Sequence, residues 1–219
     1  MYKNVIKRVF DIILSGVGIV VLAIPMLIIA IAIKIDDPGP VLFKQKRVGQ
    51  KKNGKITYFM IWKFRSMKMC TPHDTPTHLL ENPEQYITRV GRFIRKTSLD
   101  ELPQIYQVFT AKLSAIGPRP ALWSQDDLIA EREKYGANDI KPGITGWAQI
   151  NGRDELEIDV KAKFDGEYAA ALNAGSLQGF VMDMKCFFGT IVSVLKSDGV
   201  VEGGTGEMKK QEKAQKQEI

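Results

Sequence analysis

Cysteine is scarce in this sequence, which holds 2 in 219 residues. Cys70 and Cys186 lie far apart, and they show neither the spacing of zinc ligands nor a dense disulfide framework. This scarcity argues against a disulfide-stapled secreted domain and favours a reduced compartment. The chain also lacks internal repeats and any glycine-rich phosphate loop of the Walker or dinucleotide type. From the cysteines we expect the folded part of the chain to face the cytoplasm. From the missing phosphate loops we expect that any nucleotide binds at a site of a different kind.

Charge is missing from one long stretch of the chain. From Ile12 to Ile33 no residue is charged, and as a helix this run would reach about 33 Å. The hydrocarbon core of a bilayer measures about 30 Å, so the run is long enough to cross it. A cleaved secretory signal is one alternative, but its apolar core usually has about 7 to 15 residues. The length of the run, and Lys34 directly after it, argue against a signal.

The flanks of this run favour a return to the side of entry. Positive flanks tend to stay cytoplasmic, and basic residues lie on both sides of the run, at Lys3, Lys7, Arg8 and Lys34. Pro25 removes a backbone donor and crowds the preceding turn, so it can bend the helix. We predict a re-entrant membrane helix over residues 1–35, with a kinked span as the alternative.

The rest of the chain predicts one small domain. Single cores seldom outgrow about 250 to 300 residues, so residues 36–200 fit one cytoplasmic domain that carries any chemistry. Residues 201–219 are mostly Lys, Glu and Gln, and we expect a disordered tail there. Two β-prone runs, 41–43 and 56–62, predict a hairpin. Helical periodicity recurs at 86–113 with a break near Ser98, at 121–135, at 156–172 and at 180–195, and an ordered loop is expected at 142–147.

The last helical segment, 180–195, is amphipathic. It either packs on the core or lies in the bilayer interface, and packing is the commoner of the two arrangements.

Two adjacent carboxylates, Asp100 and Glu101, form the most informative feature. Basic residues surround them, and the chain's net charge of +6 favours anionic partners of several kinds. A capping box from Ser98 to Glu101 would explain the pair by helix structure alone. It would, however, place Pro103 at a helical position where its missing N–H costs a hydrogen bond. Moving the cap to Asp100 avoids that loss. In either version a carboxylate lies at a helix N-terminus, which lowers its pKa.

The two carboxylates need not have the same task, because consecutive helical residues point about 100° apart. Adjacent negative charges are tolerated when a cation such as Mg²⁺ or the guanidinium of Arg95 lies close by. An ionised aspartate beside phosphates can also act as a nucleophile. One carboxylate could therefore attack a phosphate while the other holds a metal ion.

Further polar residues could bind phosphate or a nucleotide. Arg119 lies between two prolines, and a guanidinium held in place suits bidentate phosphate contact, although a surface turn explains this tetrapeptide taken alone. Lys63 and Arg65 alternate with apolar residues, as on the exposed face of a strand. Gln149 could face a nucleobase together with Trp147, although a tryptophan in such a segment is more often a core residue. Arg153 could reach a diphosphate.

The motifs of the chain occur in a recognisable order. They are KRVFD at 7–11, QKRVG at 45–49, KFRSM at 63–67, RKTSLDELPQ at 95–104, GPRP at 117–120 and PGITGWAQ at 142–149. In this order they resemble the bacterial sugar transferases, the monotopic phosphoglycosyl transferases that act on polyprenyl phosphate. The resemblance extends to about Gly199, so only the tail falls outside it.

The resemblance implies a mostly helical α+β fold with a re-entrant membrane helix, amphipathic interfacial helices and a small β-hairpin. It places the catalytic domain on the cytoplasmic face of the inner membrane and implies Mg²⁺ as cofactor. Asp100 would attack the β-phosphorus of a UDP-sugar, UMP would leave, and polyprenyl phosphate would take the phosphosugar from the protein. Glu101 would be a metal ligand or proton acceptor beside Asp100. The residues expected to bind substrate are Arg95, Arg119, Arg153, Lys63 and Gln149.

The implied partners are a UDP-sugar, a polyprenyl phosphate such as undecaprenyl phosphate, and membrane lipids, with no nucleic acid. The product, a polyprenyl diphosphosugar, would begin the assembly of a glycan. Two alternatives stay open: a membrane-anchored basic scaffold without catalysis, and an enzyme that transfers only the sugar and releases UDP. The sugar is open, and so is the oligomeric state, with a homodimer among the alternatives.

The chain departs from the family pattern at two positions. Family members often have Ser before the helix-breaking proline, where this chain has Ile24, and this exchange puts the kink angle in question. They commonly carry Asp where this chain has Lys112. That exchange reverses a charge near the expected site, and we expect it to alter the local pairing.

Overall fold

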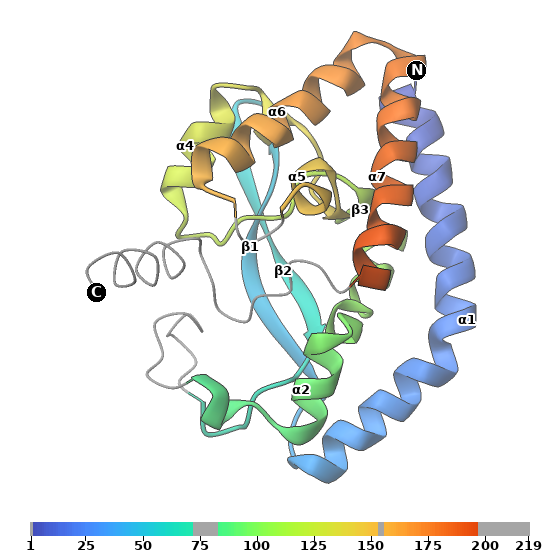
Figure 1. Ribbon diagram of the computed structural model, residues 1–219, viewed down its shortest axis with the longest axis vertical. Helices are drawn as coiled ribbons and strands as arrows, with labels where there is room; N and C mark the ends of the chain where they lie inside the picture. Colours follow the sequence, from blue (N-terminus) through green and yellow to red (C-terminus); the bar gives the residue numbers. More distant parts are fainter. Residues whose placement is uncertain (1, 72–82, 153–155, 197–219) are drawn as a thin grey trace, which may run out of the picture.

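The computed structural model describes residues 2–71, 83–152 and 156–196 (Figure 1). Arg153 and the tail predicted at 201–219 lie outside the described residues. The helices are α1 (Lys7–Asp36), α2 (Arg89–Lys96), α3 (Gln104–Phe109), α4 (Asp126–Glu133), α5 (Trp147–Ile150), α6 (Ile158–Ala174) and α7 (Ser176–Lys196), with a π-helical turn η1 (Tyr2–Ile6) and 3-10 turns η3 (Pro83–Tyr86), η4 (Leu99–Glu101) and η5 (Ala137–Asp139). The strands are β1 (Leu42–Lys52), β2 (Lys55–Phe64), β3 (Ser114–Ile116) and β4 (Gly143–Thr145). The predicted mixed, mostly helical fold is confirmed.

The N-terminal helix α1 has 30 residues and continues through Pro25, and it changes direction along its length (Figure 1). Among the described residues, the segment Tyr2–Asp36 is the one helix long and apolar enough to cross a membrane, by length and composition. Its buried residues Met26 and Ile33 pack in a cluster with Phe64. The predicted long apolar helix is confirmed, and its second half lies against the domain.

The first half of α1 is fastened to the same domain by polar contacts. Arg8 donates from two guanidinium nitrogens to carbonyls at the end of α3, each at 2.7 Å. The buried carboxylate of Asp11 accepts hydrogen bonds from Ser114 Oγ and from the backbone N–H of Ala115, both at 2.9 Å. Both halves of α1 are therefore tied to one folded body.

The end of α1 meets the end of β2 through Arg65. This side chain is 7% exposed, and its guanidinium donates to the Asp37 carboxylate at 2.5 Å and also to the Asp37 carbonyl. The prediction that Arg65 lies on an exposed strand face is wrong. The reason is that β2 ends at Phe64, so the alternation of the strand does not extend to Arg65.

The predicted hairpin is confirmed, as strands β1 and β2 pair antiparallel around a turn at Asn53 and Gly54. Both turn residues have positive φ, 50° and 76°, which suits a tight hairpin turn. The strands are longer than the predicted runs at 41–43 and 56–62. The polar residues of β1 look like a loop in the sequence, but ladder hydrogen bonds do not require apolar side chains.

A second, parallel pair of strands, β3 and β4, lies next to α5 (Figure 1). The prediction of a plain loop at 142–147 is wrong, since β4 and the start of α5 occupy it. Glycines that read as turn residues are needed here for close packing: a Cβ on Gly117 would lie 2.4 Å from the carbonyl of Lys141. The helix predicted at 121–135 is shorter too, because the carbonyl of Ala121 accepts from Val48 of β1.

Helices α6 and α7 confirm the last two helical predictions, and they meet at Gly175. One side of α7 is buried through Asp183 and Cys186. Another side carries exposed apolar residues, namely Leu177, Phe180, Val181, Phe187, Phe188, Ile191 and Val192. The helix therefore packs on the core and at the same time presents an apolar surface.

Candidate active site

The carboxylate pair lies in η4, a single 3-10 turn between α2 and α3. Ser98 takes a left-handed conformation with φ of 55°, and its side chain makes no capping bond. The prediction that Asp100 caps the following helix is wrong, because α3 begins only at Gln104, after Pro103. The physical reason is that Leu99 in the turn and Leu102 directly after it pack, partly buried, against the Phe64 cluster. Burial of these side chains decides the backbone conformation, and local capping does not.

Glu101 is held by two cations from other parts of the chain. Lys63, near the end of β2, donates to Glu101 Oε1 at 2.7 Å. Arg119 donates to the same oxygen at 2.9 Å, and its other terminal nitrogen lies 3.5 Å from Oε2. The glutamate side chain is 11% exposed. Burial by itself would raise the pKa of Glu101, but Arg119 and Lys63 hold it well below its usual range.

Asp100 has the opposite environment, although it is the next residue. Its side chain is 13% exposed and lies 3.9 Å from Lys63, and no hydrogen bond from the described residues reaches its carboxylate. Burial raises the pKa of Asp100, and Lys63 opposes that rise. The negative charge of Glu101 raises the pKa further. Arg95 and Arg119 act with Lys63 to lower the pKa. The site thus contains one carboxylate neutralised by cations, Glu101, and one that is available for another interaction, Asp100.

Arg95, in the last turn of α2, adds a guanidinium to this site. Its positive charge lowers the pKa of Asp100. Its Nη1 atom is buried and has no hydrogen-bond partner in the described part of the chain. A buried, unpaired donor is costly unless something binds it. The predicted residues Lys63, Arg95 and Arg119 therefore converge on the carboxylate pair, in an arrangement suited to an anion.

Gln149 is placed differently from these cations. It is 8% exposed in α5, and both polar atoms of its side chain are buried without a partner among the described residues. Its helix starts beside the Gly117 segment, since a Cβ on Gly146 would lie 2.3 Å from the Gly117 carbonyl. No contact between Gln149 and the carboxylate pair occurs in the described structure, so its role stays a prediction. The same holds for Arg153, which falls outside the described residues.

The sequence did not reveal the residues that hold Arg119 in place. Arg132 of α4 is 4% exposed and donates to Asp165 of α6 at 2.6 and 2.8 Å. The same guanidinium donates to the backbone carbonyl of Arg119 at 2.9 Å. Arg47 of β1 donates to the neighbouring Pro120 carbonyl at 3.1 Å. These partners come from separate elements, and no spacing in the sequence signals their contact.

Comparison with known proteins now identifies the family. Residues 2–197 match the family described as bacterial sugar transferase. The chain belongs to this family. Its relatives include UDP-glucose:undecaprenyl-phosphate glucose-1-phosphate transferase of Escherichia coli (strain K12), which is 40% identical over 76% of this chain and 36% of that protein.

Two further relatives differ in length, and the name of the second states galactose as its sugar. The exopolysaccharide production protein PSS of Rhizobium leguminosarum bv. phaseoli is 38% identical over 87% of this chain and 96% of that protein. Undecaprenyl-phosphate galactose phosphotransferase of Salmonella typhimurium is 35% identical over 89% of this chain and 41% of that protein. The chain thus spans less than half of the E. coli and Salmonella proteins and nearly all of the Rhizobium protein.

The donor set of the site bears on the expected Mg²⁺. No group of three His, Cys, Asp or Glu side chains gathers as a metal cage within the described residues. Mg²⁺ is often held by one or two carboxylates, with substrate phosphates and water completing its shell. The oxygens of Asp100 accept no hydrogen bond from the described residues, and Glu101 is its neighbour. This pair fits an ion that arrives with a phosphorylated substrate.

Lys112, one departure from the family pattern, contacts an aromatic ring. Its Nζ is 5.8 Å from the ring centroid of Trp62, and Lys44 lies 5.7 Å from the same ring. The positive charge of Lys112 is thus placed against an aromatic ring, where cations bind favourably. The described contacts of Lys112 give no pairing with Asp100 or Glu101.

Proposed function

We propose that this protein transfers a sugar 1-phosphate from a UDP-sugar to undecaprenyl phosphate or a similar polyprenyl phosphate. Family membership and the names of the relatives support the reaction class. The observation that carries the proposal is the contrast within the pair: Glu101 is bound by Lys63 and Arg119, while Asp100 accepts no hydrogen bond from the described residues. A buried aspartate that accepts no hydrogen bond from the described residues, with cations around it, suits attack on phosphorus.

The first half-reaction begins at Asp100. A carboxylate oxygen of Asp100 attacks the β-phosphorus, the bond from that phosphorus to the bridging oxygen breaks, and the oxygen leaves with UMP. The sugar phosphate is then joined to Asp100 as an acyl phosphate. Arg95 and Arg119 stabilise the charge that develops on the phosphate oxygens. A bound Mg²⁺ would neutralise further charge on these oxygens, with Asp100 and Glu101 as its protein ligands.

The second half-reaction regenerates the protein. A phosphate oxygen of the polyprenyl phosphate attacks the same phosphorus, and the bond to the Asp100 oxygen breaks. The products are polyprenyl diphosphosugar and a free carboxylate. Besides serving as a ligand for the metal ion, Glu101 would hold Lys63 and Arg119 beside Asp100 in both steps, since it is paired with both cations.

The way in which α1 is attached to the domain bears on the proposed membrane position. A helix that crossed a bilayer would place its two ends on opposite sides. Here Arg8 and Asp11 near the start of α1, and Ile33 near its end, contact the same domain. These contacts support a re-entrant helix. That the domain lies on the cytoplasmic face of the inner membrane is part of the proposal and rests on family membership. The apolar surfaces of α1 and α7 would lie in lipid, within reach of the carrier.

One experiment separates this function from its alternatives. The purified protein is incubated with UDP-glucose or UDP-galactose and undecaprenyl phosphate, and the released nucleotide is identified. The proposal expects UMP, and without the acceptor it expects a phosphosugar adduct that mass spectrometry locates on Asp100. Asp100→Asn should abolish the adduct, while the exposed control Asp126→Asn should retain it. Release of UDP would indicate transfer of the sugar alone, and release of neither nucleotide from a panel of UDP-sugars would favour a scaffold.

A further inference from the structure

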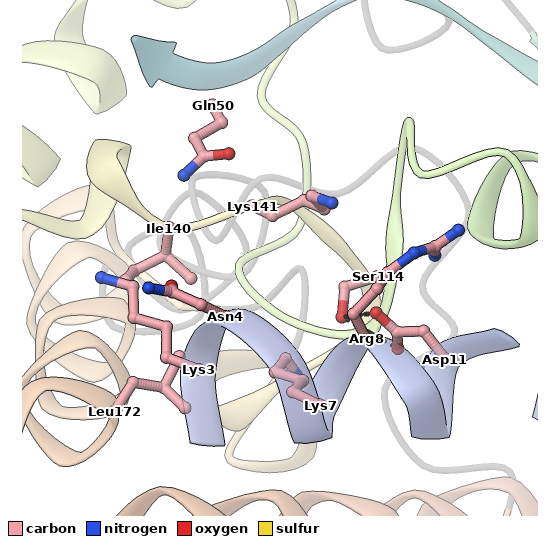
Figure 2. Close-up of a pocket in the computed structure, with 10 residues that line it drawn as sticks. All are labelled: Lys3, Asn4, Lys7, Arg8, Asp11, Gln50, Ser114, Ile140, Lys141 and Leu172. Atoms are coloured by element: carbon pink, nitrogen blue, oxygen red, sulfur yellow. Dashed lines mark hydrogen bonds between the residues drawn. The ribbon is translucent and has the colours of Figure 1, made fainter. Parts of the chain in front are cut away.

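A cavity of about 200 Å³ lies beside the start of α1. Figure 2 shows its two sides: Asn4, Lys7, Arg8 and Asp11 come from η1 and α1, and Gln50 and Lys141 approach from the opposite side. Lys3 also lines the cavity. Four cations therefore surround a small space, whereas Asp11 is the only carboxylate among the lining residues.

The charges around this cavity are not fully balanced. Lys7 is paired with Asp183 at 2.8 Å, and Asp11 is occupied by Ser114 and Ala115. Arg8 donates one hydrogen bond from each terminal nitrogen to carbonyls at the end of α3. A guanidinium has five N–H donors, and these two bonds to neutral carbonyls do not neutralise its positive charge.

Lys141 is the group for which the imbalance is clearest. Its ammonium group makes no ion pair or hydrogen bond with the described residues. Burial lowers the pKa of Lys141, and the positive charge of Arg8 lowers it further. Asp11 opposes this shift by an effect smaller than that of Arg8, and Lys52 and Lys7 add to the lowering. A cation held among other cations is stabilised when an anion enters between them.

The cavity is separate from the carboxylate pair. Gln50 lies on β1 seven positions beyond Phe43, the partner of Lys63. At about 3.3 Å per strand residue, this puts the two sites roughly 20 Å apart along the hairpin. Arg8 also binds the end of α3 that is remote from Glu101. The cavity thus does not belong to the active site described above.

We propose that this cavity binds a phosphate group, held by Lys141 and Arg8 with Lys3 at its rim. Its volume is below the roughly 300 to 1,000 Å³ of sites for drug-sized ligands, so it suits a phosphate with a small substituent better than a whole nucleotide. A phospholipid headgroup and a soluble phosphate ester share this chemistry. A headgroup would hold the start of α1 at the membrane surface, whereas a soluble ester would make the site a sensor of phosphorylated metabolites.

Lysine acylation tests the site in the unaltered full-length protein. The protein is kept in a detergent without phosphate and treated with an amine-reactive ester, and mass spectrometry follows each lysine. We expect a phosphate ligand to slow acylation of Lys141 at least fivefold relative to chloride at equal ionic strength. Lys55, exposed at the hairpin turn, is the matched control and should react at an unchanged rate. The acylation rate of Lys63 shows whether the ligand also binds at the carboxylate pair.

Two arms of the experiment identify the source of the phosphate. One uses inorganic phosphate and glycerol 1-phosphate, and the other uses micelles with phosphatidylglycerol, compared with micelles containing diacylglycerol. Protection of Lys141 in the first arm indicates a soluble ligand, and protection in the second arm alone indicates a headgroup.

A binding measurement with a variant completes the test. Lys141→Gln should remove one class of bound radiolabelled phosphate, or phosphatidylglycerol where only that protects, and Lys55→Gln should retain it. If neither arm protects Lys141, or if Lys63 alone is protected, the proposed site does not exist. Because protection is measured on the unaltered protein, a variant that fails to fold cannot hide this result.

Discussion

Two buried carboxylates in this protein have opposite surroundings. Asp183 of α7 is saturated: it accepts from Tyr2 and Tyr168, each at 2.6 Å, and is paired with Lys7 at 2.8 Å. Asp100 accepts no hydrogen bond from the described residues, although cations surround it. Buried polar groups that only stabilise a fold are normally satisfied. The difference indicates a structural role for Asp183, and it is consistent with the reactive role proposed for Asp100.

The largest expected effect comes from Asp100→Asn. Transfer should fall by about a thousandfold or more, because the amide cannot attack phosphorus. The unfolding temperature should stay the same or rise, since the variant no longer buries an ionisable carboxyl whose pKa is raised. UMP release and thermal unfolding in detergent provide the two measurements. A large loss of stability would place Asp100 in the same structural class as Asp183 and break the comparison.

The reverse pattern is expected for Asp183→Asn. Removing one partner of a buried pair leaves the Lys7 charge uncompensated and costs about 3 to 5 kcal/mol. Thermal unfolding should therefore occur about 10 °C lower, while protein that remains folded should still form the adduct on Asp100. Asp159→Asn, at an exposed position of α6, should unfold like the unaltered protein. An unchanged unfolding temperature for Asp183→Asn would contradict this assignment.

A smaller effect is expected from Arg132→Lys, which tests how firmly Arg119 must be held. Lysine keeps the charge near Asp165 but loses the fork that also reaches the Arg119 carbonyl. We expect kcat/KM to fall by about tenfold, mainly through a higher KM, because small displacements of a phosphate contact are costly. The adduct should still form. Arg92→Lys, on the exposed side of α2, is the control and should behave like the unaltered protein.

The pH dependence sharpens the contrast within the pair. In the proposed mechanism only the ionised form of Asp100 attacks, so kcat/KM should fall as the pH drops through the pKa of Asp100. Lys63 lowers that pKa, and Lys63→Met should move the acid limb to higher pH by about one unit or more. A pH profile of UMP release measures the shift, with Lys55→Met as the control. A shift to lower pH would show that another group controls the limb.

The smallest effect is expected at Lys112. Its contact with the Trp62 ring is worth about 0.5 to 1 kcal/mol at an exposed site, so Lys112→Ala should lower stability by no more than that. Transfer should stay within about twofold of the unaltered rate. A large loss of activity would show that this departure from the family pattern affects the active site after all.

Much of the architecture could be predicted because it depends on local pattern. The uncharged run around Pro25, the two β-prone runs and the helical periodicity of α6 and α7 each involve residues close together in sequence. The helix cap at Asp100 and the loop at 142–147 could not be predicted correctly. In the first, the packing of partly buried leucines overrides the capping preference. In the second, a strand partner 29 residues away fixes the backbone, since Ser114 pairs with Gly143.

The sequence by itself determined that two adjacent carboxylates occur among basic residues and that an uncharged helix precedes them. Only the tertiary structure decided that Glu101 is neutralised and Asp100 is not. Lys63 and Arg119 reach Glu101 from positions 38 and 18 residues away. Packing of β2 and of the segment held by Arg132 sets those distances. Because the Coulomb interaction of buried groups depends steeply on distance and burial, residue order alone cannot tell the two carboxylates apart.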